Sequence, residues 1–469
     1  MKNIKIRSFS SVVVLAALVV GSQLVSCSID PNMNNSPNGI SQESILTKTG
    51  QLALLVGLEA SSVGDYYSGD HSRIGSMWTW QMCAPPGLGR PQPTSWDSYL
   101  LTSDGPPDNL WKSAYYAVKQ ANDIINNSDA VFGSDLATTA NTVVAMAEWY
   151  KALCLGETAA LFGDAPIMKD VTNPTAPPTY STQADVYAEV QRLLSDAVTR
   201  FGNSAALKQD LNFKGDKASW LAACHSLKAR YFLQIHDYAN AYAEAAQGIT
   251  SAAGSVFAFY DATTAGGYSP WGHWVNDESG NPLRAEKRYI DSLKSEAGDK
   301  RLATYFTANA PGGVFVGFAA HGEANADTNE TNGLRAASLN KYSGYGDAFP
   351  YISYEEVTLI KAECEARGQG GGVSAAVTDV NVIRAAAGLT AFASSDAAAT
   401  LKEVLKQKWL QLFLEGQAYN DMRRTPEFPL WEPIHNKNYR IIYPKSEVEV
   451  NPNVPADDDS RVSSLVGIP

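Results

Sequence analysis

Apolar residues recur at helical spacing along much of the chain, and residues 216–251 show the pattern most clearly. Trp220, Cys224 and Tyr231 lie at i, i+4 and i+11, which places all three on one face of an α-helix. A second stripe at the same period begins after Asp237, whose carboxylate is suited to accept the free amide hydrogens of the next turn. This stretch therefore predicts two consecutive helices, each with one buried face.

Alanines lie between the large aromatic residues of this predicted pair, and their small size allows the two helices to pack closely. A helix pair of this length resembles a tetratricopeptide-type repeat, which spans about 34 residues. One such pair leaves an apolar face uncovered, so further pairs are needed to stack on it. The pattern therefore predicts an all-α scaffold of tetratricopeptide-like helix pairs.

The same periodicity predicts further helices over residues 45–63, 110–130, 142–162, 183–201, 353–368, 373–387 and 396–425. Gly163, followed shortly by Pro166, is typical of a helix end. The predicted 353–368 helix carries Glu355, Glu356, Glu363 and Glu365. Because Lys361 and Arg367 share this helix, we interpret the four glutamates as a solvated face and not as paired catalytic carboxylates.

Three long insertions interrupt the helical pattern, at about 64–109, 254–285 and 308–350. They are rich in aromatic residues, glycine and asparagine, and irregular stretches of this length in a compact protein are usually functional. We therefore expect a recognition surface of loop insertions on a rigid helical scaffold. Nothing in the sequence argues strongly for a second independent domain, so residues 45–469 are predicted to form a single domain.

The N-terminus has the pattern of an export signal. Three basic residues among the first seven precede an apolar run over 12–20, and the sequence Leu-Val-Ser-Cys then ends at Cys27. This ending predicts a lipoprotein signal peptide over 1–26, with Cys27 as the lipidated first residue of the mature chain; an ordinary cleaved signal with a chance cysteine is the alternative. Residues 27–44 are rich in Asn, Ser and Pro and predict a flexible tether. The mature chain is then anchored to a membrane without spanning it.

Composition argues against several classes of function. The chain has 469 residues, a net charge of −12 and no basic run, which disfavours binding to nucleic acid. Its five cysteines are widely separated and form no CxxC pair, so zinc-ligand spacing is absent. The sequence also has no GxSxG motif and no phosphate-binding loop ending in GK[ST]. We therefore expect no enzymatic activity, no metal site and no cofactor.

Aromatic residues in the insertions are the candidate ligand-binding groups. Sugar rings stack their C–H faces on flat aromatic side chains, while polar residues around the rim bind the hydroxyl groups. The candidates are Trp78, Trp80, Trp96 and Tyr99 in the first insertion, and Trp271, Trp274 and Asn276 in the second. Arg73, Asp97, Tyr268, His273 and Asp277 are polar or aromatic neighbours of these candidates.

Trp271 and Trp274 lie among glycines with little local apolar sequence to bury them, so we expect their rings to be exposed. The alternative, that the tryptophans fix the insertions to the helical core, stays open. It also stays open for the three tryptophans of the first insertion, whose methionine neighbours are themselves candidate core residues.

Four motifs follow one another in a specific order. They are LFGDAPI at 161–167, SYEEVTLIKAEC at 353–364, EGQAYNDMRR at 415–424, and YPKSE at 443–447 with NPN at 451–453. Together with the Cys27 motif and the helix pairs, they resemble the SusD/RagB family of Bacteroidetes outer-membrane lipoproteins, and in particular its second SusD-like subfamily. Phe162, Ala165 and Thr358 depart slightly from the family pattern. We interpret the charged residues of the third motif as a structural network at a helix end.

The resemblance implies a cell-surface lipoprotein of the outer membrane that captures an oligosaccharide for import by a partner SusC-type TonB-dependent transporter. In such proteins the repeat helices face the transporter and the loop insertions bind the ligand. Two alternatives remain: a peptide-binding member of the same family, or a protein-only tetratricopeptide scaffold. The resemblance does not identify the ligand, because the binding loops vary within the family.

Overall fold

The computed structural model describes residues 42–85, 95–97, 101–168, 176–277, 283–319, 335–425, 427 and 440–456. The predicted signal peptide, Cys27 and nearly all of the predicted tether lie outside these residues, as does Tyr99. Within the described residues, no helix is both long enough and apolar enough to cross a membrane.

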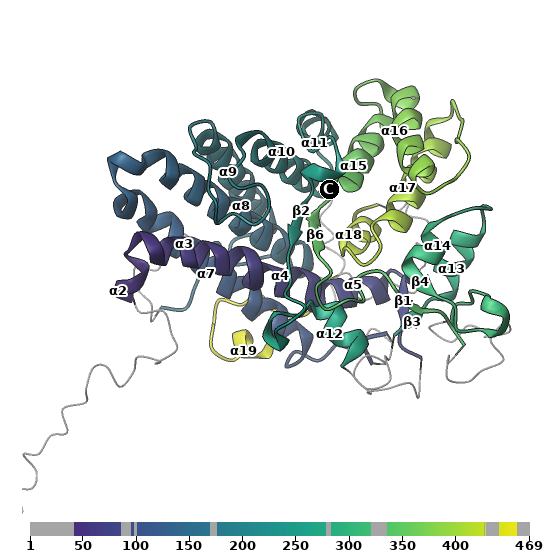
Figure 1. Cartoon of the computed structure of the whole chain (residues 1–469), viewed down its shortest axis with the longest axis horizontal. Helices are drawn as coiled ribbons and strands as arrows, with labels where there is room; N and C mark the ends of the chain where they lie inside the picture. The colour runs from purple at the N-terminus through teal and green to yellow at the C-terminus, as the bar shows by residue number, and fades with distance from the viewer. Residues whose placement is uncertain are drawn as a thin grey trace, which may run out of the picture.

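Stacked antiparallel helices form the scaffold (Figure 1). They are α7 (Pro106–Phe132), α8 (Ala137–Phe162), α9 (Gln183–Phe201), α10 (Lys217–Gln234), α11 (Tyr238–Ala245), α15 (Tyr354–Ala366), α16 (Gly372–Ala386) and α17 (Ala397–Gln411). Along the series, α7 to α11 pack each on the next, α11 packs on α15, and α15 packs on both α16 and α17. The predicted all-α scaffold of tetratricopeptide-like pairs is confirmed, although the chain between α11 and α15 leaves the stack to form insertions.

The central pair, α10 and α11, has the caps that its sequence predicts. The Asp216 carboxylate accepts a hydrogen bond from Ser219 N at 2.9 Å, and the Asp237 carboxylate accepts one from Asn240 N at 3.1 Å. Between the two helices, His236 adopts a positive φ of 60°, which turns the chain sharply. On α10 the stripe containing Trp220 is buried, so periodicity, capping and burial agree.

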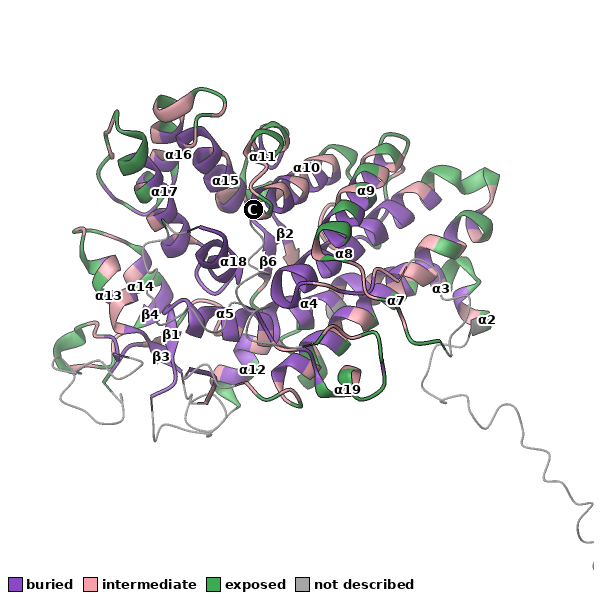
Figure 2. Ribbon diagram, turned by 180° about the vertical axis from the view of Figure 1, so that it is seen from behind, coloured by how far each residue is buried: buried purple, intermediate pink, exposed green. Residues whose placement is uncertain are grey.

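An aromatic core joins the scaffold to the chain that follows the second and third insertions. Trp149 of α8 meets Trp220 of α10 edge to face, with 5.7 Å between the ring centroids. Tyr351 packs on Trp149 and on Tyr150, and all four rings are fully buried. Such edge-to-face pairs add specific geometry to the burial of apolar area. In Figure 2, the inner sides of these helices are buried and the outer turns are exposed.

The first predicted insertion is wrong for residues 64–78, which are helical. The chain runs through α2 (Gln42–Ile45), α3 (Lys48–Gly57), a π-helical turn (Leu58–Ser62), α4 (Val63–Tyr66), a second π-helical turn (Tyr67–His71) and α5 (Ser72–Trp78). Gly69 has non-helical dihedral angles and introduces a kink, which explains why the glycine-rich sequence conceals the helical pattern. Ile74, Met77 and Trp78 of α5 are buried, so packing stabilises this helix.

Short strands and helices occur among the described residues of the insertions and in the chain between the second and third insertions. Three two-stranded antiparallel ladders occur in the described part of the chain: β1 (Met82–Cys83) with β3 (Arg284–Ala285), β2 (Val256–Ala258) with β6 (Phe349–Ile352), and β4 (Phe306–Thr307) with β5 (Ser338–Leu339). The helices are α12 (Pro270–Asn276), α13 (Lys287–Lys294), α14 (Arg301–Tyr305) and the 3₁₀ turns Ala252–Gly254, Ala265–Gly267 and Pro311–Gly313; a further 3₁₀ turn, Ser134–Leu136, joins α7 to α8. The ladders link the insertions to one another, and Figure 1 shows α12, β1, β3 and α13 on the opposite side of the molecule from α9 to α11.

The predicted last helix, 396–425, is broken in two. Helix α17 ends at Gln411, and α18 (Gln417–Arg424) begins after Gly416, which has a positive φ of 76°. A Cβ at Gly416 would lie 2.4 Å from His71 Cε1, so only glycine permits this close approach. Further on, α19 (Lys445–Val448) lies near the N-terminal end of α7, where Lys445 N donates to Ser103 O at 2.9 Å.

Candidate functional site

The five candidate tryptophans are buried. Their exposed fractions are 2% for Trp78, 3% for Trp80, 5% for Trp96, 1% for Trp271 and 4% for Trp274, so the predicted exposure of Trp271 and Trp274 is wrong. Distant segments bury them: Trp271 Nε1 donates to Ser72 Oγ at 2.9 Å, and Trp78 Nε1 donates to Trp96 O at 2.9 Å. The five tryptophans are therefore core residues that fix the insertions to the helical scaffold, which is the alternative stated from the sequence.

Arg73 of α5 lies on this tryptophan layer. Its guanidinium carbon is 3.4 Å from the ring centroid of Trp274 and 5.3 Å from that of Trp96, both within the range of a cation–π interaction. Asp70 forms an ion pair with Arg73 and also accepts a hydrogen bond from Asn109 Nδ2 at 3.2 Å. The Arg73 side chain is 20% exposed. Its guanidinium group therefore packs on an aromatic floor, formed by the rings of Trp274 and Trp96, and remains accessible to solvent.

The outer side of α12 carries exposed polar groups. His273 Nδ1 and Asp277 Oδ2 are 2.6 Å apart, and the Tyr345 hydroxyl donates to Asp277 Oδ1 at 2.5 Å. This hydrogen bond and the contact with His273 lower the pKa of Asp277, and the same hydrogen bond raises the pKa of Tyr345 to about 12. The ring of Tyr345 stacks on Tyr268 with 3.9 Å between centroids. The second and third insertions thus meet at a half-exposed aromatic pair.

Asn276 is exposed at the end of α12, and its amide nitrogen donates to Gly272 O at 2.7 Å and to Ser343 O at 2.8 Å. Together, Arg73, Tyr268, His273, Asn276, Asp277 and Tyr345 form what we call the insertion face. The sequence named five of these six residues among its candidates or their neighbours and missed Tyr345. Its aromatic ring in a glycine-rich segment of the third insertion was the available signal.

Asp97 lies next to Trp96 and has a different environment. It is 7% exposed, and its Oδ1 has no hydrogen-bond partner among the described residues. Burial raises the pKa of Asp97 to about 7, and a hydrogen bond from the backbone of Ala84 opposes the shift. Asp97 is therefore buried and does not contribute to the exposed surface of the insertion face.

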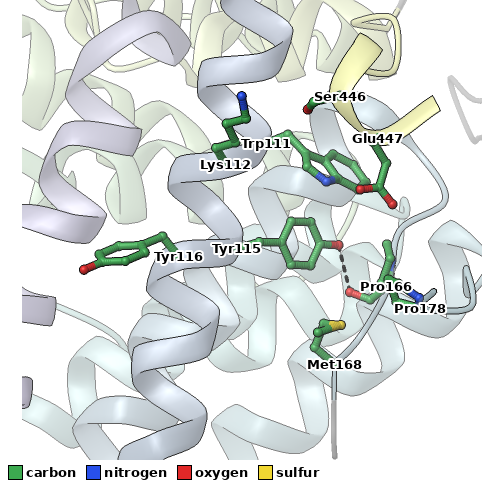
Figure 3. A pocket seen from close by; sticks show the side chains of 9 residues that line it. All are labelled: Trp111, Lys112, Tyr115, Tyr116, Pro166, Met168, Pro178, Ser446 and Glu447. Atoms are coloured by element: carbon green, nitrogen blue, oxygen red, sulfur yellow. Dashed lines mark hydrogen bonds between the residues drawn. The ribbon is translucent and has the colours of Figure 1, made fainter. Parts of the chain in front are cut away.

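A cavity of about 440 Å³ lies beside the N-terminal part of α7 (Figure 3). Its lining consists of Trp111, Lys112, Tyr115, Tyr116, Pro166, Met168, Pro178, Ser446 and Glu447. These residues come from α7, from the two ends of the connection between α8 and α9, and from α19. The Tyr115 hydroxyl donates to Pro166 O at 2.8 Å and fixes one wall.

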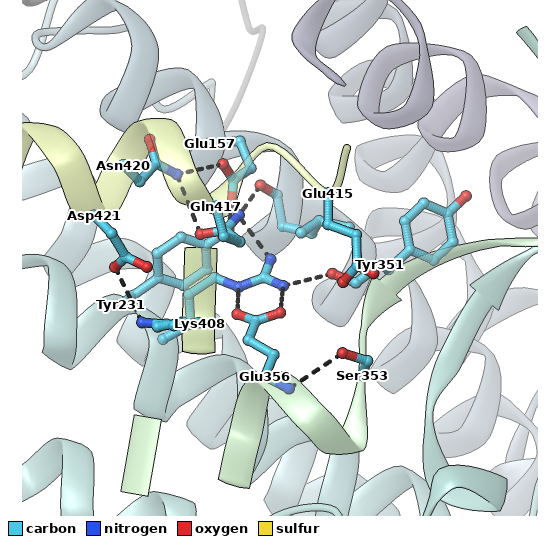
Figure 4. Close-up of polar contacts among 12 residues, drawn as sticks. Glu157, Tyr231, Tyr351, Ser353, Glu356, Lys408, Glu415, Gln417, Asn420 and Asp421 are labelled. Atoms are coloured by element: carbon cyan, nitrogen blue, oxygen red, sulfur yellow. Dashed lines mark hydrogen bonds and ion pairs between the residues drawn. The ribbon is translucent and has the colours of Figure 1, made fainter. Parts of the chain in front are cut away.

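The charged residues of the sequence motifs form buried networks (Figure 4). Arg230 of α10 pairs with Glu356 of α15 at 2.6 Å, donates to Tyr351 O at 2.5 Å and lies 3.3 Å from Glu157 of α8. Burial opposes ionisation of Glu157, but hydrogen bonding to His71 and the charge of Arg230 lower its pKa to about 2. The network therefore holds three scaffold helices together as an ionised cluster.

A second network joins the second and third motifs. Arg424 of α18 forms ion pairs with Glu363 of α15 at 2.5 Å and with Asp421 at 2.6 Å, and Lys408 lies 3.0 Å from Asp421. The predicted structural network of the third motif is confirmed. The predicted solvated face of α15 is wrong, because Glu356, Glu363 and Glu365 are each at most 2% exposed and pair with cations from other elements or their own helix.

Comparison with known proteins decides the family. The model of the SusD-like_2 family, described as starch-binding and associating with the outer membrane, matches residues 91–444 of the chain. The chain belongs to the SusD-like family. The resemblance based on four ordered motifs is thereby confirmed. No curated protein matches the chain at a significant level.

Solved structures show the same SusD-like fold at low sequence identity. A SusD/RagB family protein from Bacteroides thetaiotaomicron is 18% identical, covers 89% of this chain and 96% of its own, and has a TM-score of 0.67. A SusD homologue from Parabacteroides distasonis is 19% identical, with 86% and 93% coverage and a TM-score of 0.67. A chitin-binding SusD homologue from Flavobacterium johnsoniae is 17% identical, with 87% and 93% coverage and a TM-score of 0.67.

Proposed function

We propose that this SusD-like protein captures an oligosaccharide at the outer membrane, and that the insertion face binds it. The observation that carries this proposal is the position of Arg73, held on the rings of Trp274 and Trp96 with part of its side chain open to solvent. The guanidinium group keeps its hydrogen-bond donors in one plane, which suits the recognition of oxygen atoms on a neutral sugar.

The rest of the insertion face supplies the other groups that a sugar requires. Tyr268 and Tyr345 offer aromatic surface for the C–H face of a sugar ring, while His273, Asp277 and Asn276 are polar groups for its hydroxyls. Mutual contacts fix the positions of these side chains before a ligand arrives, which reduces the entropy lost on binding. We retain Tyr99 as a proposed ligand contact, because Arg73 and Trp96 of the same insertion lie in this region.

Two neutral polysaccharides are the first ligands to test. The family description names starch, and the name of the Flavobacterium johnsoniae structure names chitin. Both polymers consist of neutral pyranose rings, which matches a surface on which Arg73 is already paired with Asp70.

The first experiment is calorimetric titration of the chain from Ser28 to Pro469 with malto-oligosaccharides, chito-oligosaccharides, other plant and microbial glycans, and a peptide mixture. We expect saturable binding of one oligosaccharide class and its loss in Tyr345→Ala. Tyr238→Ala is the matched control, because Tyr238 is a half-buried tyrosine of the repeat helix α11. Binding of peptides alone would support the peptide-binding alternative, and no binding of either class would support the protein-only scaffold.

We also propose that Cys27 carries a lipid anchor and that a SusC-type TonB-dependent transporter receives the ligand. The basic, apolar and Leu-Val-Ser-Cys segments of the N-terminus support the anchor, and the family's association with the outer membrane supports both proposals. Cys27→Ser should release the protein from the outer-membrane fraction. Co-purification with the transporter from detergent-solubilised membranes tests the partner, and persistence of Cys27→Ser in the membrane pellet would contradict the anchor.

A further inference from the structure

The cavity beside α7 has the features of a second binding site. Its volume of about 440 Å³ falls within the range of small-molecule sites, which is roughly 300–1,000 Å³. Figure 3 shows Trp111 and Tyr115 along one wall, with Ser446 and Glu447 at one end and Met168 towards the other. The apolar wall and the polar end therefore face one open pocket.

The polar groups of the cavity are held in place by neighbouring side chains. Lys112 pairs with Asp108, and Ser446 donates its hydroxyl hydrogen to the other oxygen of the same carboxylate. The Glu447 carboxylate accepts hydrogen bonds from Asn451 Nδ2 at 2.7 Å and from the Tyr180 hydroxyl at 3.3 Å. An anionic ligand would be repelled by the Glu447 carboxylate, whereas a neutral ligand with several hydroxyl groups would add hydrogen bonds to these groups.

The cavity is connected to the insertion face through two adjacent residues at the start of α7. Asp108 binds Lys112 and Ser446 at the rim of the cavity. Its neighbour Asn109 donates to Asp70, which forms the ion pair with Arg73 on the insertion face. The cavity rim and the carboxylate partner of Arg73 thus contact consecutive residues of α7, which makes a chain of several sugar units the occupant to test at both sites.

We propose that this cavity is a second carbohydrate subsite, which takes one neutral sugar unit of a longer oligosaccharide bound at the insertion face. This proposal rests on the proposed function. The sugar ring packs on Met168 and Tyr115, and its hydroxyl groups bind Lys112, Ser446 and Glu447. The second contact makes binding of long chains tighter than binding of short chains, because the added unit binds within the same complex.

The test compares short and long ligands in matched variants. The probes are maltotriose with maltodecaose and chitotriose with chitooctaose, titrated into the chain from Ser28 to Pro469. Met168→Trp fills the cavity, and Glu447→Gln removes the carboxylate from its rim while keeping a side chain of the same shape. We expect both variants to weaken binding of the long probe by about tenfold and to leave binding of the trimer unchanged. Arg73→Ala should weaken both lengths.

The outcomes separate this proposal from the proposed function. If wild-type protein binds the trimer but both cavity variants bind the long probe as tightly as wild type, the second subsite is overturned and the proposed function stands. If wild-type protein binds none of the four probes or the other glycans, oligosaccharide capture itself is overturned. Should Met168→Trp melt well below wild type, Glu447→Gln alone decides the question.

Discussion

Arginines of the scaffold and of the insertion face have partners of the same kind but very different access to solvent. Arg230 and Arg424 are at most 3% exposed and lie within closed groups of carboxylates. Arg73 has a carboxylate partner in Asp70 and an aromatic floor, but one-fifth of its side chain remains open to solvent. Charge pairing alone therefore does not identify a binding site in this protein.

The difference explains why the most recognisable motifs are not the binding residues. The ionised groups of 353–364 and 415–424 bind one another across α15 and α18, and a ligand cannot reach them without opening the scaffold. The groups of the insertion face are held by hydrogen bonds and ring contacts at the surface, so a ligand can add to these contacts or replace them. In this chain the charged residues of the sequence motifs stabilise the fold. The candidate site is formed by partly exposed charged residues that lie beside aromatic rings.

The largest expected effect comes from breaking the scaffold network. Arg230→Ala leaves Glu356 and Glu157 buried without their shared cation, and we expect the free energy of unfolding to fall by about 3–5 kcal/mol. Urea denaturation measures this change. Lys119→Ala is the control, because Lys119 pairs with Asp123 at the surface and its loss should cost less than about 1 kcal/mol. Equal effects of the two variants would contradict the comparison.

A second effect on stability, of similar total size but dependent on pH, comes from Glu59, which lies buried beside Asp210. Burial, together with the charge of Asp210, raises the pKa of Glu59 to about 8. Between pH 4.5 and pH 8 the native state therefore holds a proton that the unfolded chain has lost. The stability that this group contributes is fully present below pH 4.5, and it falls by about 1.4 kcal/mol per pH unit until pH 8. Glu59→Gln should remove this contribution, so the stability of the variant relative to wild type should rise between pH 5 and pH 8 in urea titrations. A constant difference across that range would contradict the assigned pKa.

On the insertion face we expect a large effect on binding with a small effect on stability. Arg73→Ala removes the cation from the Trp274 floor and should weaken oligosaccharide binding by about tenfold or more, with less than about 2 kcal/mol lost in stability. Arg288→Ala is a matched control, because its guanidinium carbon lies 3.4 Å from the ring centroid of Trp80, outside the insertion face. If both variants bind equally well, the insertion face is not the site.

The smallest effect is expected at the surface of α12. Tyr345→Phe removes the hydrogen bond that contributes most to the lowered pKa of Asp277, so this pKa should move upwards towards its ordinary value. A lowered pKa stabilises the native state at pH values above the unfolded pKa, and this effect is lost as the pH falls through the folded pKa. The variant should therefore be slightly less stable than wild type near neutral pH, and the difference should disappear in acid. Carboxyl carbon NMR measures the shift, and an unchanged pKa would mean that His273 alone controls Asp277.

The sequence predicted the scaffold well because helical periodicity and capping are local. The stripe of Trp220 on α10 and the caps at Asp216 and Asp237 depend on residues within a few positions of one another. The break before α18 was missed because its cause is distant: Gly416 is required by the approach of His71. A glycine within a predicted helix was the only local signal of that break.

The candidate site was predicted in part, and the errors share one cause. Trp271 was expected to be exposed because its own neighbours are glycines, but the partner that buries its indole nitrogen is Ser72, far away in the sequence. Tyr345 was missed for the same reason, since its partner Asp277 lies in another insertion. The local sequence identified the insertions that contain the candidate binding site. Which of their aromatic residues are exposed to solvent depends on packing between segments that are distant in the sequence.

The buried cysteines have a practical consequence for studying this protein. Cys83, Cys154, Cys224 and Cys364 are fully buried, and burial raises the pKa of each thiol, that of Cys364 to about 12. Folded protein that starts at Ser28 therefore presents these four thiols as unreactive neutral groups. A single cysteine introduced at exposed Val448 can then carry a fluorophore without removal of any native cysteine, and its signal would report on occupancy next to the α7 cavity in real time.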